Sequence, residues 1–223
     1  KQHIVESNYE RPEDKFCTDI FYDFSPILIL LNSLTDFKKS HKRKFWYNIN
    51  RSKKLISNEI GSYSFKKYYD NEAIDLLPSI RKIFLDRWKN DYTTFSWKHE
   101  KGFLKFEHAI KEIVSKFNND KFDVSIIQLD NDSTILAYSL GFQLQNTYHF
   151  FMHNVNINYN KSRYSLGTVL LDYMIRDFIE NDKINIFDFM LGLNNYKLKW
   201  TKQKKQIFWR VETKRKIVFL PIH

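Results

Sequence analysis

The chain has 223 residues, of which 43% are hydrophobic and 17% aromatic, and it carries a formal net charge of +10. Such a composition is typical of a globular protein, so disorder is not the default expectation. The positive charge predicts attraction to polyanions, a class that includes nucleic acid, anionic membrane surfaces and phosphorylated cofactors, but it does not choose among them.

Cysteine use and hydrophobic runs exclude two further classes. Cys17 is the single cysteine of the sequence, which excludes an internal disulfide and a cysteine-based zinc site. The longest apolar run, residues 25–34, is too short to span a bilayer, so we expect no transmembrane segment. We therefore expect a reducing, cytoplasmic compartment.

The first third of the chain predicts one long helix between two strands. Residues 1–24 show no clear periodicity and predict a loop or tail, whereas residues 26–31 predict a short strand. A helix is predicted over 33–61, because apolar residues recur along one stripe and Gly61 is a suitable C-terminal stop. The opposite side of this helix is strongly basic. A strand over 62–69 follows.

Two more helices are predicted before the middle of the chain. The first begins at Asp70, a good N-cap, and Pro78 predicts a kink or break within it. The second carries apolar side chains at spacings of three and four, namely Phe103, Phe106, Ile110, Ile113 and Phe117. Both are expected to be packing elements.

The second half of the chain predicts strands around one further helix. An antiparallel meander is predicted over 122–129, 134–143 and 147–158. The elements that follow are a helix over 165–182, an apolar strand over 184–191, a short helix from Asn194, and strands over 206–212 and 216–222. This order predicts the α/β fold class, with a mixed sheet and flanking helices.

The start of the helix over 165–182 is a candidate anion site. A helix N-terminus presents unpaired N–H groups and partial positive charge, and a glycine lets a phosphate approach closely. Gly167 lies at this point, and Ser165 and Thr168 add hydroxyl groups. Arg163 adds a fixed charge. The alternative interpretation is structural: Ser165 is an N-cap and Gly167 permits a tight turn.

The stretch 186–202 ends an apolar strand on a carboxylate, which is costly to bury unless it is paired or used. Asp188 is a candidate general base, or a group that orients a substrate amine. Tyr196 is a candidate proton donor, because a phenol stays protonated at neutral pH. The alternative interpretation is that Asp188 caps the next turn or pairs with Lys197 or Lys199.

Histidines and basic stretches are weaker candidates. His149 and His153 are expected to face the same side of a strand at roughly 13 Å, too far apart to share a metal ion, and we expect no metal site. His149 is interpreted as a core or partly exposed histidine. The basic stretches 38–54 and 197–216 are interpreted as solvated faces; the alternatives are contact with RNA, with cofactor phosphates or with another partner.

Several of these residues recur together in a known family. Residues 38–205 resemble the acetyltransferase domain of the GNAT superfamily, in the branch called CelD-like or BioF2-like, which is akin to the FemAB aminoacyltransferases. That branch has a Tyr-Ser-Pro-Gly turn before a Leu-rich helix, then Asp-Phe-x-x-Gly-x-x-x-Tyr-Lys and a nearby Trp. The matching residues are Tyr164, Ser165, Gly167, Asp188, Phe189, Gly192, Tyr196, Lys197 and Trp200, and Leu166 stands where the family has proline.

The resemblance implies a GNAT-like N-acyltransferase fold with a phosphate-binding helix N-terminus. It implies acetyl-CoA or another acyl-CoA as co-substrate, and direct transfer of the acyl group to an amine on a small molecule or sugar. The residues expected at the pyrophosphate are Arg163, Tyr164, Ser165, Gly167 and Thr168. Asp188 and Tyr196 are assigned as base and acid, and Lys197 completes the expected catalytic set.

Two alternatives to this function stay open. One is FemAB-like transfer from aminoacyl-tRNA, which the basic helix would suit; no other nucleic acid is an expected partner. The other is a catalytically inert GNAT-like binding module. Because members of this branch often carry two half-domains, residues 1–37 are expected to be the remnant of a truncated first half and 38–223 the acyltransferase domain.

Overall fold

Two units make up the part of the chain that the computed structural model describes. The described residues are 16–31, 33–90, 96–116, 121–181 and 184–213. The main unit is Leu28–Asp188, and the described residues before and after it form the ribbon unit. Hydrogen-bonded strands follow the order β2-β3-β4-β5-β6-β1-β7, in which β1 runs through both units.

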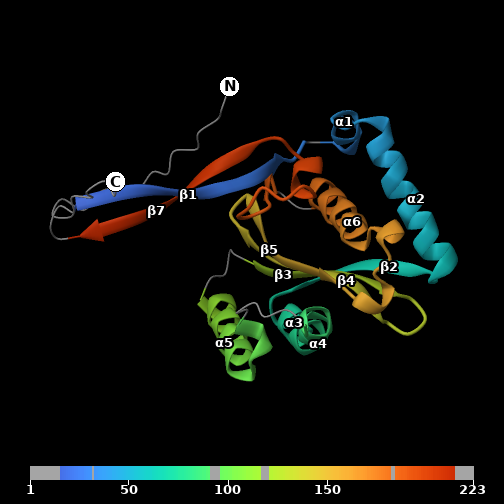
Figure 1. Ribbon diagram of the computed structural model, residues 1–223, viewed down its shortest axis with the longest axis horizontal. Coiled ribbons are helices and arrows are strands. Elements are labelled where there is room, and N and C mark those ends of the chain that lie inside the picture. The colour runs from blue at the N-terminus through green and yellow to red at the C-terminus, as the bar shows by residue number, and fades with distance from the viewer. Residues whose placement is uncertain (1–15, 32, 91–95, 117–120, 182–183, 214–223) are drawn as a thin grey trace. The chain divides into compact units, whose positions relative to one another are not determined.

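The sheet of the main unit combines an antiparallel meander with one parallel strand (Figure 1). The antiparallel strands are β2 (Tyr63–Tyr69), β3 (Lys121–Leu129), β4 (Ile135–Leu144) and β5 (Thr147–Val155). Strand β6 (Ile186–Asp188) pairs parallel with the start of β5. Beyond β6 lies the end of β1 (Phe16–Ile29), next to which the Leu30 N–H donates to the Asn185 carbonyl oxygen at 2.8 Å. The predicted meander and mixed sheet are confirmed.

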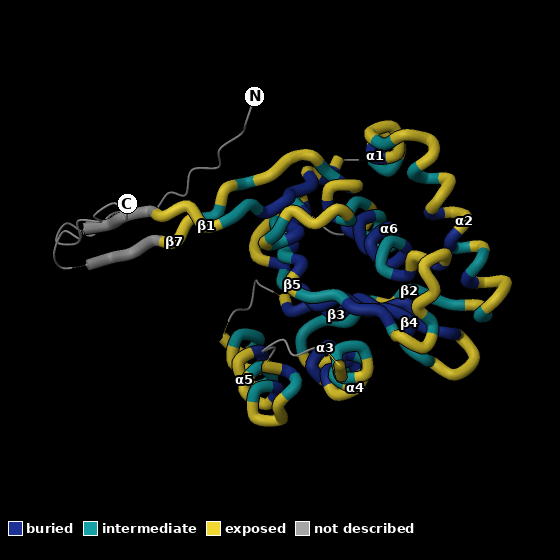
Figure 2. The backbone as a smooth tube through the Cα atoms, in the orientation of Figure 1, coloured by how far each residue is buried: buried dark blue, intermediate teal, exposed yellow. Residues whose placement is uncertain are grey.

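Helices cover both faces of this sheet, so its centre is buried (Figure 2). One face carries α3 (Asp70–Asp75), α4 (Leu77–Trp88) and α5 (Glu100–Lys116). These helices share a core with Phe122 and Tyr138 of the sheet. The other face carries α6 (Leu166–Glu180), whose Tyr173 stacks on Phe65 of β2. Every residue of β3 after Lys121 is therefore buried, as expected for a strand covered on both faces.

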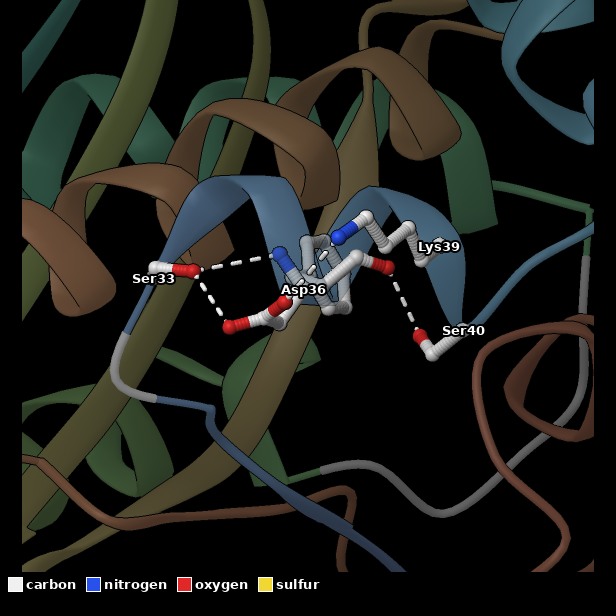
Figure 3. Close-up of polar contacts among 5 residues, drawn as sticks. Ser33, Asp36, Lys39 and Ser40 are labelled. Carbon is white, nitrogen blue, oxygen red and sulfur yellow. Dashed lines mark hydrogen bonds and ion pairs between the residues drawn. The ribbon is translucent and has the colours of Figure 1, made fainter.

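The helix predicted over 33–61 is in fact two helices, α1 (Leu34–Lys39) and α2 (Arg43–Glu59). Ser33 caps the first, because its Oγ accepts the Asp36 N–H at 3.1 Å (Figure 3). Ser40 ends it by donating its hydroxyl to the Phe37 carbonyl oxygen at 2.7 Å. Serine hydroxyls that bond the nearby backbone favour helix ends, which explains the break.

Asp70 has a different role from the predicted N-cap. The cap position of α3 is Tyr69, and Asp70 adopts a left-handed φ of 50°. Its carboxylate accepts the Phe122 N–H of β3 at 3.0 Å. The N-cap prediction is wrong because this carboxylate takes its partner from a neighbouring strand. The break predicted at Pro78 is confirmed, since α4 begins at Leu77.

The ribbon unit contains the antiparallel pair of β1 and β7 (Lys204–Thr213), with register from Phe16↔Thr213 to Pro26↔Lys204. The tail predicted over 1–24 is wrong from residue 16 onward; the earlier residues and the strand predicted over 216–222 lie outside the described part. A register shift between Phe21 and Asp23 interrupts the two-residue alternation, which is why this strand is hard to recognise in the sequence.

Candidate active site

The start of α6 has no side-chain cap. Ser165 occupies the N-cap position with a left-handed φ of 48°. Ser165 is thus the N-cap residue, as the structural interpretation expects, but its hydroxyl donates to the Ser162 carbonyl oxygen at 3.3 Å and accepts no helix N–H. Ser165 is exposed, and Thr168 is partly exposed. This end of α6 therefore keeps the partial positive charge of a helix N-terminus, together with two hydroxyl groups.

Gly167 is the one glycine of the five that the fold does not require. An added Cβ would lie 3.8 Å from His153 and from Val155, an ordinary contact, and the residue has no left-handed φ. The other four are constrained: Gly61 and Gly192 have positive φ, and a Cβ at Gly102 or Gly141 would approach other atoms to 2.1 or 2.2 Å. The tight-turn interpretation of Gly167 is wrong, because the left-handed residue of this turn is Ser165.

Arg163 and Tyr164 are both tied to Glu59 at the end of α2. The Tyr164 hydroxyl donates to Glu59 Oε2 at 2.8 Å, and the Arg163 guanidinium forms an ion pair with the same oxygen. Tyr164 is buried, whereas the Arg163 side chain is 52% exposed. Tyr164 thus anchors the turn before α6, and Arg163 keeps part of its guanidinium at the surface. Sequence reasoning missed Glu59, which is remote along the chain.

The middle of α6 is anchored by a buried carboxylate that the sequence did not single out. Asp172 is fully buried, and its Oδ2 lies 2.6 Å from the Lys53 ammonium of α2. Its Oδ1 accepts a hydrogen bond from Arg176 Nε at 2.8 Å. The Lys53 ammonium also lies 3.8 Å from the centre of the Tyr173 ring. These contacts hold α2 on α6, and with it the turn that Glu59 anchors.

Strands β5 and β6 separate after a short parallel pairing. The paired residues are Thr147↔Ile186, Tyr148↔Phe187 and His149↔Asp188, after which β5 continues to Val155 paired with β4 but not with β6. The strand predicted over 184–191 is therefore shorter than expected. At the point of separation, His149 Nδ1 lies 3.3 Å from Asp188 Oδ2. Asp188 is 1% exposed and His149 is 24% exposed, so the histidine is the accessible member of the pair.

The two histidines of β5 lie on opposite faces, which corrects the expectation that they share one. His149 pairs with Phe142 and His153 with Ser139, and the β4–β5 register shifts between Leu140 and Gly141. The extra residue on β5 reverses the alternation of its side chains. His153 therefore lies on the face of α6, next to Gly167, and His149 on the opposite face.

Tyr196 and Lys197 belong to the ribbon unit, whereas Asp188 belongs to the main unit. Burial raises the pKa of Tyr196 to about 12, so its phenol is protonated at neutral pH. Lys197 is buried, and its ammonium donates to the carbonyl oxygens of Met190 at 3.1 Å and Leu191 at 2.6 Å. Lys197 therefore holds the turn that follows Asp188 in the chain.

Two further kinds of site, metal sites and membrane spans, concern the described residues. In that part of the chain, no group of three or more His, Cys, Asp or Glu side chains is placed to hold a metal ion. None of the described helices combines the length and the hydrophobicity that a membrane span requires.

Solved structures resemble this chain at low sequence identity. A conserved protein of unknown function from Bacteroides thetaiotaomicron superposes with a TM-score of 0.51 and 12% identity, over 90% of this chain and 62% of that one. The C-terminal domain of a putative lysylphosphatidylglycerol synthetase from Agrobacterium fabrum has a TM-score of 0.54 and 9% identity, over 91% and 63%. FemX has a TM-score of 0.54 and 10% identity, over 87% and 61%. These likenesses concern the fold.

The chain spans about three fifths of the length of these solved chains. The comparison with curated proteins finds no match. The family model described as acetyltransferase (GNAT) domain matches residues 43–198, a segment that runs from the start of α2 past Tyr196 and includes both the start of α6 and Asp188. The predicted GNAT-like fold is confirmed, and the chain belongs to the GNAT acetyltransferase domain family.

Proposed function

We propose that this protein is an N-acyltransferase that moves an acetyl group from acetyl-CoA to an amine on a small molecule or sugar by direct attack. Membership of the GNAT acetyltransferase family supports an acyltransferase. The narrower CelD-like or BioF2-like assignment stays a prediction, as does the division of the chain at residue 37.

The observation that carries this proposal is Gly167 at the uncapped start of α6. Packing and backbone conformation both tolerate a side chain there, so neither explains its absence. A ligand that must approach the backbone closely does explain it, and a phosphate at a helix N-terminus is such a ligand. In this proposal Ser165, Thr168 and the exposed part of Arg163 add donors to the pyrophosphate of CoA. The buried Tyr164, bound to Glu59, anchors this turn.

Transfer of an acetyl group to an amine has three requirements. The amine must lose a proton, the tetrahedral oxyanion must meet hydrogen-bond donors, and the thiolate must gain a proton as it leaves. Asp188 is the proposed source of basicity, acting through another group because it is 1% exposed. Tyr196 is the proposed acid, and its raised pKa, about 12, keeps the proton available at neutral pH.

Lys197 is proposed to position Tyr196. Its ammonium bonds two backbone carbonyls of the turn at residues 190 and 191, between Asp188 and Tyr196 in the chain. A charged hydrogen bond of this kind restricts the path of the backbone. The proposed part of Lys197 in catalysis is therefore to shape the segment that carries Tyr196.

A second candidate is transfer from aminoacyl-tRNA, which the surface of α2 favours. Arg43, Arg51 and Lys54 are exposed on α2, and among the described residues none of them has a carboxylate partner. An exposed row of cations attracts the phosphates of RNA. The third candidate, an inert binding module, would bind neither ligand.

Calorimetric titration of the whole chain with acetyl-CoA, and in parallel with total tRNA at low and high salt, separates the three candidates. Micromolar binding of acetyl-CoA is the expected result. Steeply salt-dependent binding of tRNA without binding of acetyl-CoA would favour the second candidate. Binding of neither would favour the inert module. If acetyl-CoA binds, Tyr196→Phe is expected to leave its affinity unchanged and to slow transfer.

A further inference from the structure

We propose that His149 is the group that takes the proton from the acceptor amine, and that Asp188 positions its imidazole. This inference rests on the proposed acyltransferase function and assigns the base of that same site. The residue motif points to Asp188 and assigns no role to His149, and the family match gives only the range 43–198.

The burial of the two side chains favours His149 over Asp188 as the group that contacts the amine. A carboxylate that is 1% exposed cannot itself contact an amine that arrives from solvent. A buried carboxylate also needs a partner, because desolvation of an unpaired charge is costly. His149 provides that partner at 3.3 Å and is 24% exposed, so it links Asp188 to the surface.

The register of the sheet determines which side chains neighbour His149. His149 and Asp188 are the last residues paired between β5 and β6. On β4, the neighbour of His149 is Phe142, which is apolar. Of the two residues paired with His149, Asp188 is therefore the ionisable one. The pair is therefore held by two backbones in a ladder and does not depend on a loop.

The position of the pair along β5 is compatible with the length of CoA. The start of α6 lies beside the far end of this strand, since a Cβ at Gly167 would lie 3.8 Å from Val155. Six residues separate His149 from Val155, roughly 20 Å at the rise of a strand. CoA carries its thioester at the end of a long flexible arm, so phosphates at α6 and a reacting carbonyl near His149 are compatible.

The base and the proposed phosphate site lie on opposite faces of β5. His153 lies on the face of α6, whereas His149 lies on the face on which Phe151 stacks against Phe106 of α5. A base on the face opposite the phosphate site receives the amine from the side that CoA does not occupy. The donor and the acceptor would thus meet at the strand from opposite faces.

The proton transfer balances without a further reactant. In this proposal the Nδ1–H of His149 is directed at Asp188 Oδ2, 3.3 Å away, which leaves the Nε2 lone pair to accept the proton of the attacking amine. The C–N bond forms to give the tetrahedral intermediate, and the C–S bond breaks as that intermediate collapses. The leaving thiolate is protonated by the proposed acid, which regains its proton from solvent. The imidazolium then returns its proton to solvent. The products are an amide and the free thiol of CoA.

Nitrogen-15 NMR of the histidine side chains tests the pair in the whole chain, without an acceptor. His149→Gln assigns the signals of interest, and His108, whose side chain on α5 is 77% exposed, serves as the internal reference. At alkaline pH we expect His149 to be mainly the Nδ1–H tautomer, and to lose that majority in Asp188→Asn. Saturating acetyl-CoA should shift the His149 signals and leave those of His108 unchanged.

Kinetics with acetyl-CoA and the probe amines glucosamine and lysine methyl ester give the second readout. In His149→Ala we expect kcat to fall about 100-fold, with the KM for acetyl-CoA unchanged, and added imidazole to restore part of the rate. His108→Ala is the matched control and should keep the wild-type rate. Rescue by imidazole is not expected of a residue with a purely structural role.

The outcomes separate this inference from the proposed function. An Nε2–H tautomer in the wild type, or His149 signals that saturating acetyl-CoA does not move, would overturn the role of His149 while acetyl-CoA binding stands. A wild-type rate in His149→Ala would do the same. Absence of acetyl-CoA binding would overturn the proposed function, and this role with it, even if the tautomer depends on Asp188.

Discussion

The start and the middle of α6 differ in how completely the protein satisfies them. In the middle, Asp172 is fully buried and bound by Lys53 and Arg176, which ties α6 to α2. At the start, the N-cap Ser165 gives no side-chain bond to the helix, and Gly167 has no packing reason to be a glycine. The difference indicates that the middle of α6 contributes stability, whereas its start is the end at which the proposed function places the CoA phosphates.

The largest expected effect concerns the middle of α6, the stabilising region. Asp172→Ala leaves two partly buried cations without their carboxylate, and we expect a loss of about 3 kcal/mol in the free energy of unfolding. Urea denaturation followed by circular dichroism measures it. The matched control is Lys39→Ala, which removes an exposed pair with Asp36 and should change stability little. Equal losses in both variants would contradict the distinction.

The next largest effect concerns the start of α6. Gly167→Glu places charge and bulk at the start of α6, so we expect acetyl-CoA to bind at least about 100-fold more weakly, equivalent to about 2.7 kcal/mol. The folded state should persist, because a Cβ at this position meets only ordinary contacts. Calorimetry gives the affinity and thermal unfolding checks the fold. Unchanged affinity in a folded variant would exclude this helix end as the phosphate site.

A pH titration sharpens the comparison for the middle of α6. Burial, and then the hydrogen bond with Tyr173 and the nearby negative charges, raise the pKa of Tyr63. The folded state keeps this proton after the unfolded state has lost it, so stability is intact below pH 10 and falls above it. Each such tyrosine contributes a slope of about 1.4 kcal/mol per pH unit.

Tyr63→Phe should reduce the alkaline slope of the unfolding free energy by about one such contribution. Tyr138 and Tyr148, whose pKa values burial also raises, should maintain the rest of it. Urea denaturation between pH 9 and pH 11 measures both slopes. Identical slopes for the variant and the wild type would show that Tyr63 titrates alike in both states.

The smallest effect concerns the glycine alone. Gly167→Ala should stabilise the fold slightly, by about 0.5 kcal/mol, because alanine restricts the unfolded chain and its Cβ meets no clash. Gly141→Ala is the matched contrast, since its Cβ would lie 2.2 Å from Tyr148 and should destabilise the sheet. Thermal unfolding compares them. A destabilised Gly167→Ala would mean that packing does require this glycine.

Much of the main unit was predictable because its periodic patterns are local. The meander, the helix after it and the break at Pro78 each follow from residues that are neighbours in the chain. The break between α1 and α2 and the role of Asp70 were missed, because short serine and aspartate side chains choose among several nearby backbone groups. Strand β1 was missed because its partner, β7, is distant in the sequence.

By itself, the amino-acid sequence determined the fold class, the family motif and the candidate residues at the start of α6 and at Asp188. Only the tertiary structure decided what each residue meets. It paired Asp188 with His149, bound Arg163 and Tyr164 to Glu59, and put the two histidines of β5 on opposite faces. The physical reason is that strand register and long-range ion pairs depend on packing between distant segments, which no local pattern encodes.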